Sequence, residues 1–144
     1  MAMAYARYTK VPVDRSRAEI ERLLSHYKAD QFGTAIDNDK GRAMVQFRLQ
    51  KRLIRFDLPF PNKNEQEVRR RWRALVLSIK AKLEAVESGI TSFESEFLGY
   101  VVLPDGRTVG ETIRPELDRL IQSNQMPQSL LPDYSAKGHG TLAE

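Results

Sequence analysis

The sequence predicts an α+β fold: a small antiparallel sheet of three or four strands packed on a central helix at about residues 66–88, with two further C-terminal helices and a flexible tail. Two observations support this prediction. Apolar and polar residues alternate over short neighbouring segments, as in half-buried strands, and apolar residues recur every three to four positions over a longer segment, as on the buried face of a helix. We expect a single α+β domain over residues 1–124 and a poorly ordered tail over residues 125–144, where Leu130 and Leu131 are the residues suited to docking.

The N-terminal part of the chain predicts a strand followed by a helix. Residues 5–13 mix aromatic and β-branched residues, and Pro12 suggests the end of a strand. The sequence SRAE at residues 16–19 has the pattern of a capping box, which marks a helix start. Apolar residues with helical spacing follow it: Ile20, Leu23, Leu24 and Tyr27.

The next segment predicts a three-stranded meander. Residues 31–36 can extend, and DNDKG at residues 37–41 has the composition of a turn. Residues 42–50 alternate, with Ala43, Val45, Phe47 and Leu49 on one face. A reversal near Gln50 and Lys51 leads into residues 53–58, and the prolines of LPFPN end that strand.

The central helix is predicted from a stripe roughly 100° wide, formed by Val68, Trp72, Leu75, Val76, Ile79, Leu83 and Val86. Gly89 is a suitable C-terminal stop. The side of this helix opposite the apolar stripe carries uncharged residues: Ala74, Leu77, Ser78, Ala81 and Ala85. A second helix or a partner subunit in a homo-oligomer could cover it.

Two shorter helices are predicted after it. TSFE at residues 91–94 is a second capping pattern, and the helix that it begins would direct Phe93, Phe97, Leu98 and Val101 inward. LPDGRTV at residues 103–109 is a turn, and TVGE at residues 108–111 is a third capping pattern. The last helix would run to about Ser123 with Ile113, Leu117, Leu120 and Ile121 periodic, and Pro115 would kink or restart it.

Much of the chain resembles a family of small, functionally uncharacterised proteins encoded by bacteriophages and prophages. The resemblance covers roughly residues 7–131, and its recurring block is IKAKLEAVESGI, FESEFL and VLPDGRTVGE, preceded by SRAEIERLLSHYKA. It implies a viral protein in the host bacterial cytosol, and it brings no assigned activity. Phage accessory proteins of this size commonly serve DNA metabolism or inhibit host defence.

The charge is unevenly distributed along the chain. Residues 42–82 carry twelve Lys and Arg against three Asp and Glu, whereas residues 83–123 carry three against eight. Either the basic and acidic segments pair with each other or with a symmetry mate, or a basic surface is available to a polyanion.

The leading functional hypothesis is a non-catalytic protein that binds nucleic acid, because Lys and Arg neutralise phosphates and release counterions. The candidate residues lie on the predicted hairpin and the edge of the central helix: Arg42, Arg48, Lys51, Arg52, Arg55, Arg69 and Arg73. The alternative is an anti-defence protein that binds a host immune factor such as a CRISPR or other nuclease complex, with nucleic-acid mimicry by Glu94, Glu96, Glu111, Glu116 and Asp118. A nucleotide-binding sponge is a third possibility.

No catalytic or ligand signature is visible. The two histidines, His26 and His139, are not accompanied by residues with the spacing of a catalytic triad or a metal site, and the chain has no cysteine. We therefore expect no enzyme, metal site or cofactor. DNDKG lacks the spacing of a calcium loop. The order of one helix, three strands and one helix is also that of double-stranded-RNA-binding domains, although the added C-terminal helices are foreign to them. No apolar run suits a membrane span or a signal peptide, which is consistent with a cytosolic protein.

Overall fold

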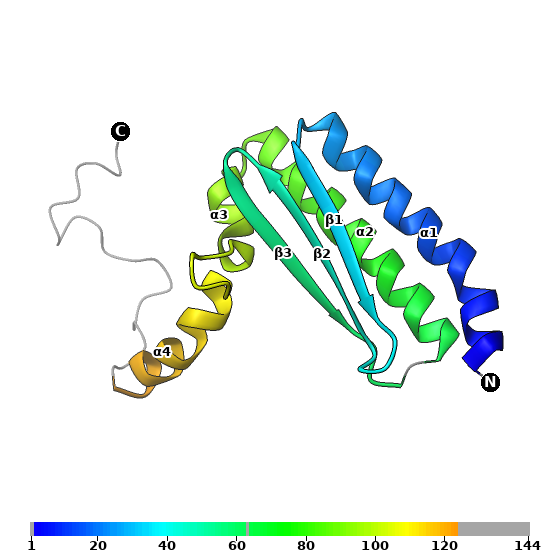
Figure 1. Cartoon of the computed structure of the whole chain (residues 1–144). Coiled ribbons are helices and arrows are strands. Elements are labelled where there is room, and N and C mark those ends of the chain that lie inside the picture. The colour runs from blue at the N-terminus through cyan, green and yellow to red at the C-terminus, as the bar shows by residue number, and fades with distance from the viewer. Residues whose placement is uncertain (1, 63, 124–144) are drawn as a thin grey trace, which may run out of the picture. The chain divides into compact units, whose positions relative to one another are not determined.

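The computed structural model describes residues 2–62 and 64–123, with side chains described from residue 12 to residue 122 apart from Lys63. The elements are α1 (Ala2–His26), β1 (Gln31–Asp37), β2 (Arg42–Leu49), β3 (Arg52–Pro59), α2 (Glu65–Ser88), α3 (Phe93–Phe97), the 3-10 turn η1 (Leu98–Tyr100) and α4 (Val109–Ser123) (Figure 1). The chain divides into two compact units, Met1–Glu111 and Thr112–Glu144. The α+β prediction is confirmed. The predicted tail lies outside the described residues.

The three strands form an antiparallel meander in the order β1-β2-β3, as predicted. In this register Val45 of the central strand is opposite Thr34 of β1 and Phe56 of β3. Gln50 and Lys51 form the turn between β2 and β3 with φ angles of 51° and 65°. Left-handed residues at both turn positions match the right-handed twist of the flanking strands, so this short turn fixes the hairpin register.

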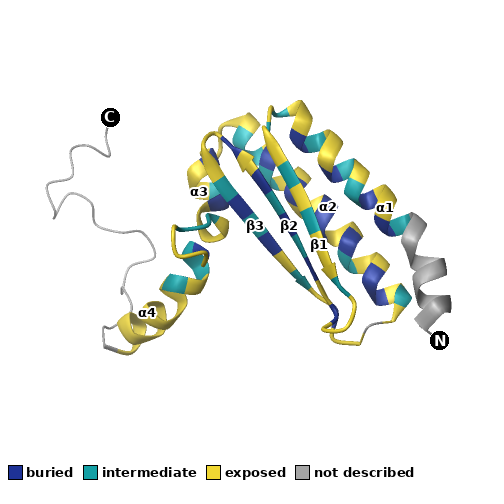
Figure 2. Ribbon diagram, in the orientation of Figure 1, coloured by how far each residue is buried: buried dark blue, intermediate teal, exposed yellow. Residues whose placement is uncertain are grey.

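The core lies between one face of the sheet and the two long helices. The odd-numbered residues of β2 point inward and are buried, whereas Arg42 and Arg48 on its other face are exposed. Figures 1 and 2 show α1 and α2 on the buried side of the sheet. Buried and exposed residues alternate along β2 and β3. Trp72, at 1% exposure, is the largest of the fully buried side chains. It belongs to the buried cluster that also includes the inward side chains of β2, β3, α1 and α3.

The N-terminal prediction is wrong, because the expected strand over residues 5–13 and the expected helix start at Ser16 are both parts of α1. The helix runs through Pro12. Val13, Ser16, Ile20 and Leu24 are buried and share one face of the helix. The apolar stripe therefore begins before the capping pattern, and burial of this stripe outweighs the local signals for a strand and a cap.

The central helix is confirmed, and it begins one residue earlier than predicted. Asn64 caps α2, and its side chain accepts a hydrogen bond from the Glu67 amide at 2.7 Å. Gly89 ends the helix with φ 87°, in the left-handed conformation that favours glycine. The back of α2 at Ala74, Leu77 and Ala81 is exposed in the described part of the chain.

The next helix is shorter than predicted. Ser92, rather than Thr91, caps α3, which ends at Phe97, and Leu98 is 49% exposed. Val101 does not continue the helix but bridges Ile54 at the free edge of β3, where the Val102 amide donates to the Leu53 carbonyl at 2.8 Å. Backbone pairing to the sheet edge therefore replaces further helical hydrogen bonds.

The last helix begins as predicted and continues through Pro115 without a restart. The capping pattern is confirmed in both directions: the Glu111 amide donates to Thr108 Oγ1 at 3.1 Å, and the Thr108 amide donates to Glu111 Oε1 at 2.9 Å. The apolar residues of α4 are each about half exposed: Ile113, Leu117, Leu120 and Ile121.

Candidate nucleic-acid interface

One arginine on the outer face of the sheet and one at its turn are matched by carboxylates. Arg48 binds Asp30 with its Nη2 2.6 Å from Oδ2, and Arg52 binds Glu94 of α3 at 2.9 Å. The side-chain hydrogen bond from Arg48 is the main reason that the pKa of Asp30 is lowered. Both pairs are exposed, so they neutralise charge more than they stabilise the fold.

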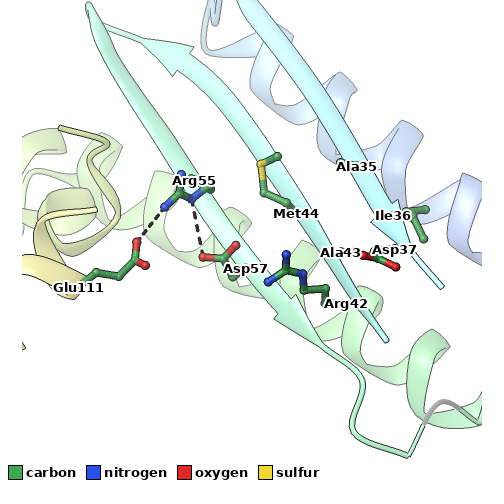
Figure 3. Close-up of a pocket in the computed structure, with 9 residues that line it drawn as sticks. All are labelled: Ala35, Ile36, Asp37, Arg42, Ala43, Met44, Arg55, Asp57 and Glu111. Atoms are coloured by element: carbon green, nitrogen blue, oxygen red, sulfur yellow. Dashed lines mark hydrogen bonds and ion pairs between the residues drawn. The ribbon is translucent and has the colours of Figure 1, made fainter. Parts of the chain in front are cut away.

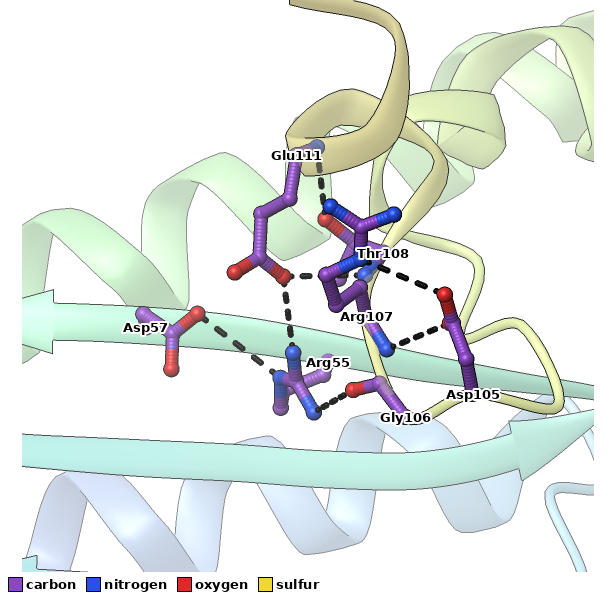
Figure 4. Close-up of polar contacts among 7 residues, drawn as sticks. All are labelled: Arg55, Asp57, Asp105, Gly106, Arg107, Thr108 and Glu111. Carbon is purple, nitrogen blue, oxygen red and sulfur yellow. Dashed lines mark hydrogen bonds and ion pairs between the residues drawn. The ribbon is translucent and has the colours of Figure 1, made fainter.

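Arg55 on β3 is the centre of a more enclosed network, because its side chain is only 19% exposed. Its guanidinium donates to the Gly106 carbonyl and to Glu111 Oε1, each at 2.8 Å, and its Nε lies 3.7 Å from Asp57 (Figure 4). Glu111 is also the capping residue at the start of α4. Arg55 therefore attaches the segment that follows α3 to the sheet.

The pKa of Glu111 is lowered, first by the Thr108 amide, then by the Thr108 hydroxyl and by Arg55. A carboxylate whose folded-state pKa is lowered adds stability above its unfolded-state pKa, and this stability is lost as the pH falls through the folded-state value. We expect the melting temperature to fall on acidification from about pH 6 to about pH 3, and to fall less steeply in Glu111→Gln. Equal slopes in thermal melts of the two proteins would contradict this expectation.

A hollow of about 490 Å³ lies on the outer face of the sheet beside this network. Met44 and Ala35 line it together with a rim of charged residues, comprising Asp37, Arg42, Arg55, Asp57 and Glu111 (Figure 3). Three carboxylates and two arginines give this rim no excess of positive charge. The hollow therefore does not favour an anionic nucleotide, the ligand of the predicted sponge.

The structure does not bring the seven predicted cations together on one surface. Arg42 and Arg48 lie about 20 Å apart along β2, at about 3.3 Å per residue. Lys51 lies at the turn next to Arg52, and Arg55 is engaged in its network. Arg69 and Arg73 lie on α2, which packs on the face of the sheet opposite to Arg42 and Arg48 (Figure 1).

A different cationic surface lies on the outer side of the two long helices. We call it the helix-layer surface, and its exposed cations are Arg15, Arg22, Arg69, Arg70, Arg73 and Lys80. Arg15 and Arg22 lie about 140–160° from the buried Ile20, at about 100° per residue. Three carboxylates, Glu19, Glu84 and Glu87, accompany the six cations, which leaves an excess of three positive charges on this surface.

Few of these cations are neutralised. Arg73 binds Glu19 of α1 at 2.8 Å, and Arg70 lies 3.9 Å from Glu67. The remaining four form no ion pair with another described residue: Arg15, Arg22, Arg69 and Lys80. Sequence reasoning selected Arg69 and Arg73 at the edge of the central helix. It did not select the α1 arginines, although their helical spacing opposite Ile20 was a usable signal.

Most of the acidic candidates also form ion pairs with Lys or Arg. Glu94 binds Arg52, Glu111 binds Arg55, and Glu96 binds Lys82 at 3.3 Å. Lys82 also lies 5.1 Å from the centroid of the Tyr100 ring. Glu116 forms its ion pair with Arg119 in the same helix, and Asp118 lies on α4. The basic and acidic segments of the chain thus pair with each other at three points.

Comparison with known proteins adds no assignment, since no family model, curated protein or solved structure matches the chain. None of the described helices has the length and apolar character needed to cross a membrane. Within the described residues, no group of three or more His, Asp or Glu side chains is arranged to hold a metal ion.

Proposed function

We propose that this protein binds nucleic acid through the helix-layer surface. The observation that carries the proposal is the contrast between the two faces of the first unit. Arg48, Arg52 and Arg55 around the sheet are neutralised by Asp30, Glu94 and Glu111. The remaining exposed cations around the sheet, Lys40, Arg42 and Lys51, lie at its turns and at one strand end, whereas the helix layer presents an excess of cations along two adjacent helices. Unpaired Lys and Arg side chains bind phosphates and release condensed counterions, which gives an affinity that depends on salt.

The protein-binding alternative has less support from these contacts. Nucleic-acid mimicry requires carboxylates that are free to imitate phosphates, but Glu94, Glu96 and Glu111 are each bound to a cation. A protein partner at the exposed back of α2, including a second copy of the chain, remains compatible with the exposure of Leu77.

The test is fluorescence anisotropy with labelled oligonucleotides at several salt concentrations. We expect binding at low salt that weakens as salt rises, and an affinity about 10- to 100-fold lower in Arg69→Gln/Lys80→Gln, with the slope of log K against log salt reduced by about 2. Both substituted side chains are exposed, so the fold should be retained.

The matched control is Lys40→Gln/Lys51→Gln, which removes the same charge from two exposed turns of the sheet. It should leave the affinity within about threefold of the wild type. A larger loss in this control than in the helix variant would place the interface at the turns, and absence of binding at low salt would contradict the proposed function.

A further inference from the structure

The cations of the helix-layer surface form two rows. Along α1, Arg15 and Arg22 are seven residues apart, a rise of about 10 Å. Along α2, Arg69, Arg73 and Lys80 extend over eleven residues, a rise of about 16 Å. Helices in contact have axes about 8–10 Å apart, which sets the scale of the separation between the two rows.

Two contacts, one between the helices and one made by the residue that follows α1, show that the rows run alongside each other. Glu19 of α1 binds Arg73 of α2 at 2.8 Å, and the Tyr27 hydroxyl donates to Glu87 at 3.3 Å. From the first contact to the second, the residue number rises in both segments, from 19 to 27 and from 73 to 87. The two helices therefore run parallel. Arg22 lies between the two contacts on α1, and Lys80 lies between them on α2.

Two parallel rows of cations suit two rows of phosphates. A duplex presents such rows on either side of each groove, and these grooves are about 6 Å and 12 Å wide in B-form DNA. The estimated spacing of the cation rows falls within this range. A single strand that follows one row leaves the other row without phosphates.

Few side chains between and beside the rows are suited to base stacking. Ala18, Ala74 and Leu77 are exposed there, whereas Trp72 is 1% exposed and points into the core. His26 and Tyr27 at the C-terminal end of α1 are aromatic, but they contact each other edge to face, and the half-buried Tyr27 is bound to Glu87 through its hydroxyl. Proteins that bind single strands without sequence preference combine a cationic groove with exposed aromatic faces. The described residues of the helix-layer surface supply cations without a platform of exposed Phe, Tyr or Trp rings.

We infer that the partner is a double-stranded nucleic acid, bound through phosphates of both strands by the two rows; this inference rests on the proposed function. The bound chemistry is the phosphate geometry of a duplex, which both DNA and RNA can supply. Sequence-specific contacts to bases play no part in this mode.

The experiment compares labelled duplex DNA and duplex RNA of about two helical turns with their separated strands, between about 50 and 200 mM salt. We expect at least one duplex to bind about tenfold or more tightly than either of its strands. Single strands that bind as tightly as both duplexes would overturn the inference and leave the proposed function intact. If no oligonucleotide binds, the proposed function itself fails.

A second pair of variants tests the two rows separately. Arg15→Gln/Arg22→Gln removes the α1 row, and Arg69→Gln/Lys80→Gln removes two cations of the α2 row. Each should weaken duplex binding by about tenfold or more. Unchanged duplex affinity after loss of the α1 row would overturn the inference, because one row would then suffice. Circular dichroism of each variant shows whether the helices are retained.

Discussion

Replacement of Trp72 by alanine is expected to lower the free energy of unfolding by about 3–5 kcal/mol. Trp72 is the largest fully buried side chain, and it contributes to the cluster formed by the sheet, α1, α2 and α3. Alanine favours the helix, so the loss would come from the cavity and the lost burial of apolar surface rather than from helix propensity. Denaturant unfolding followed by circular dichroism measures the change.

Leu77→Ala on the same helix is the matched control, because Leu77 is 52% exposed. It should change the unfolding free energy by less than about 1 kcal/mol. If Trp72→Ala does not fold, Trp72→Phe, which retains most of the apolar volume, should fold with an intermediate stability. Similar stabilities for Trp72→Ala and Leu77→Ala would contradict the assigned core.

Replacement of Arg55 by methionine is expected to cost about 2–3 kcal/mol, since hydrogen bonds to charged groups contribute about 1.5–3 kcal/mol each and the new side chain retains part of the packing. The change removes donors to Gly106 and Glu111 and leaves Glu111 with only its capping contacts. The loss should appear in denaturant unfolding followed by the fluorescence of the single tryptophan.

Arg48→Met is the control for Arg55. Arg48 has a similar ion pair with Asp30, but its side chain is 44% exposed, and exposed pairs contribute about 0–1 kcal/mol. An Arg55 variant that is no less stable than the Arg48 variant would show that the network does not hold the segment after α3 to the sheet.

The meander and the central helix could be predicted because their signals are local and agree with the packing. Alternation over β2 and the stripe from Val68 to Val86 each identify the face that the core covers. The N-terminal prediction failed because Pro12 and the capping pattern at Ser16 are local signals, whereas Val13 and Ile20 are buried against the rest of the domain. Local propensity is a weak guide where tertiary packing opposes it.

The candidate interface could be predicted only in part, because charge neutralisation depends on contacts between residues distant in the sequence. Arg55 and Glu111 are 56 positions apart, and Arg73 and Glu19 are 54 apart. Composition therefore revealed an excess of cations but could not separate those held by carboxylates from those that are not. Arg69 belongs to the second group, and Arg52 belongs to the first.

The double role of Glu111 couples the start of α4 to the sheet. Forming the first turn is the unfavourable step for any helix, and later turns add more easily. In this chain the first turn of α4 includes a residue that Arg55 of β3 holds in place. The sheet therefore adds to the local capping contacts of Thr108, so that the first turn of α4 gains stability once β3 has joined the meander.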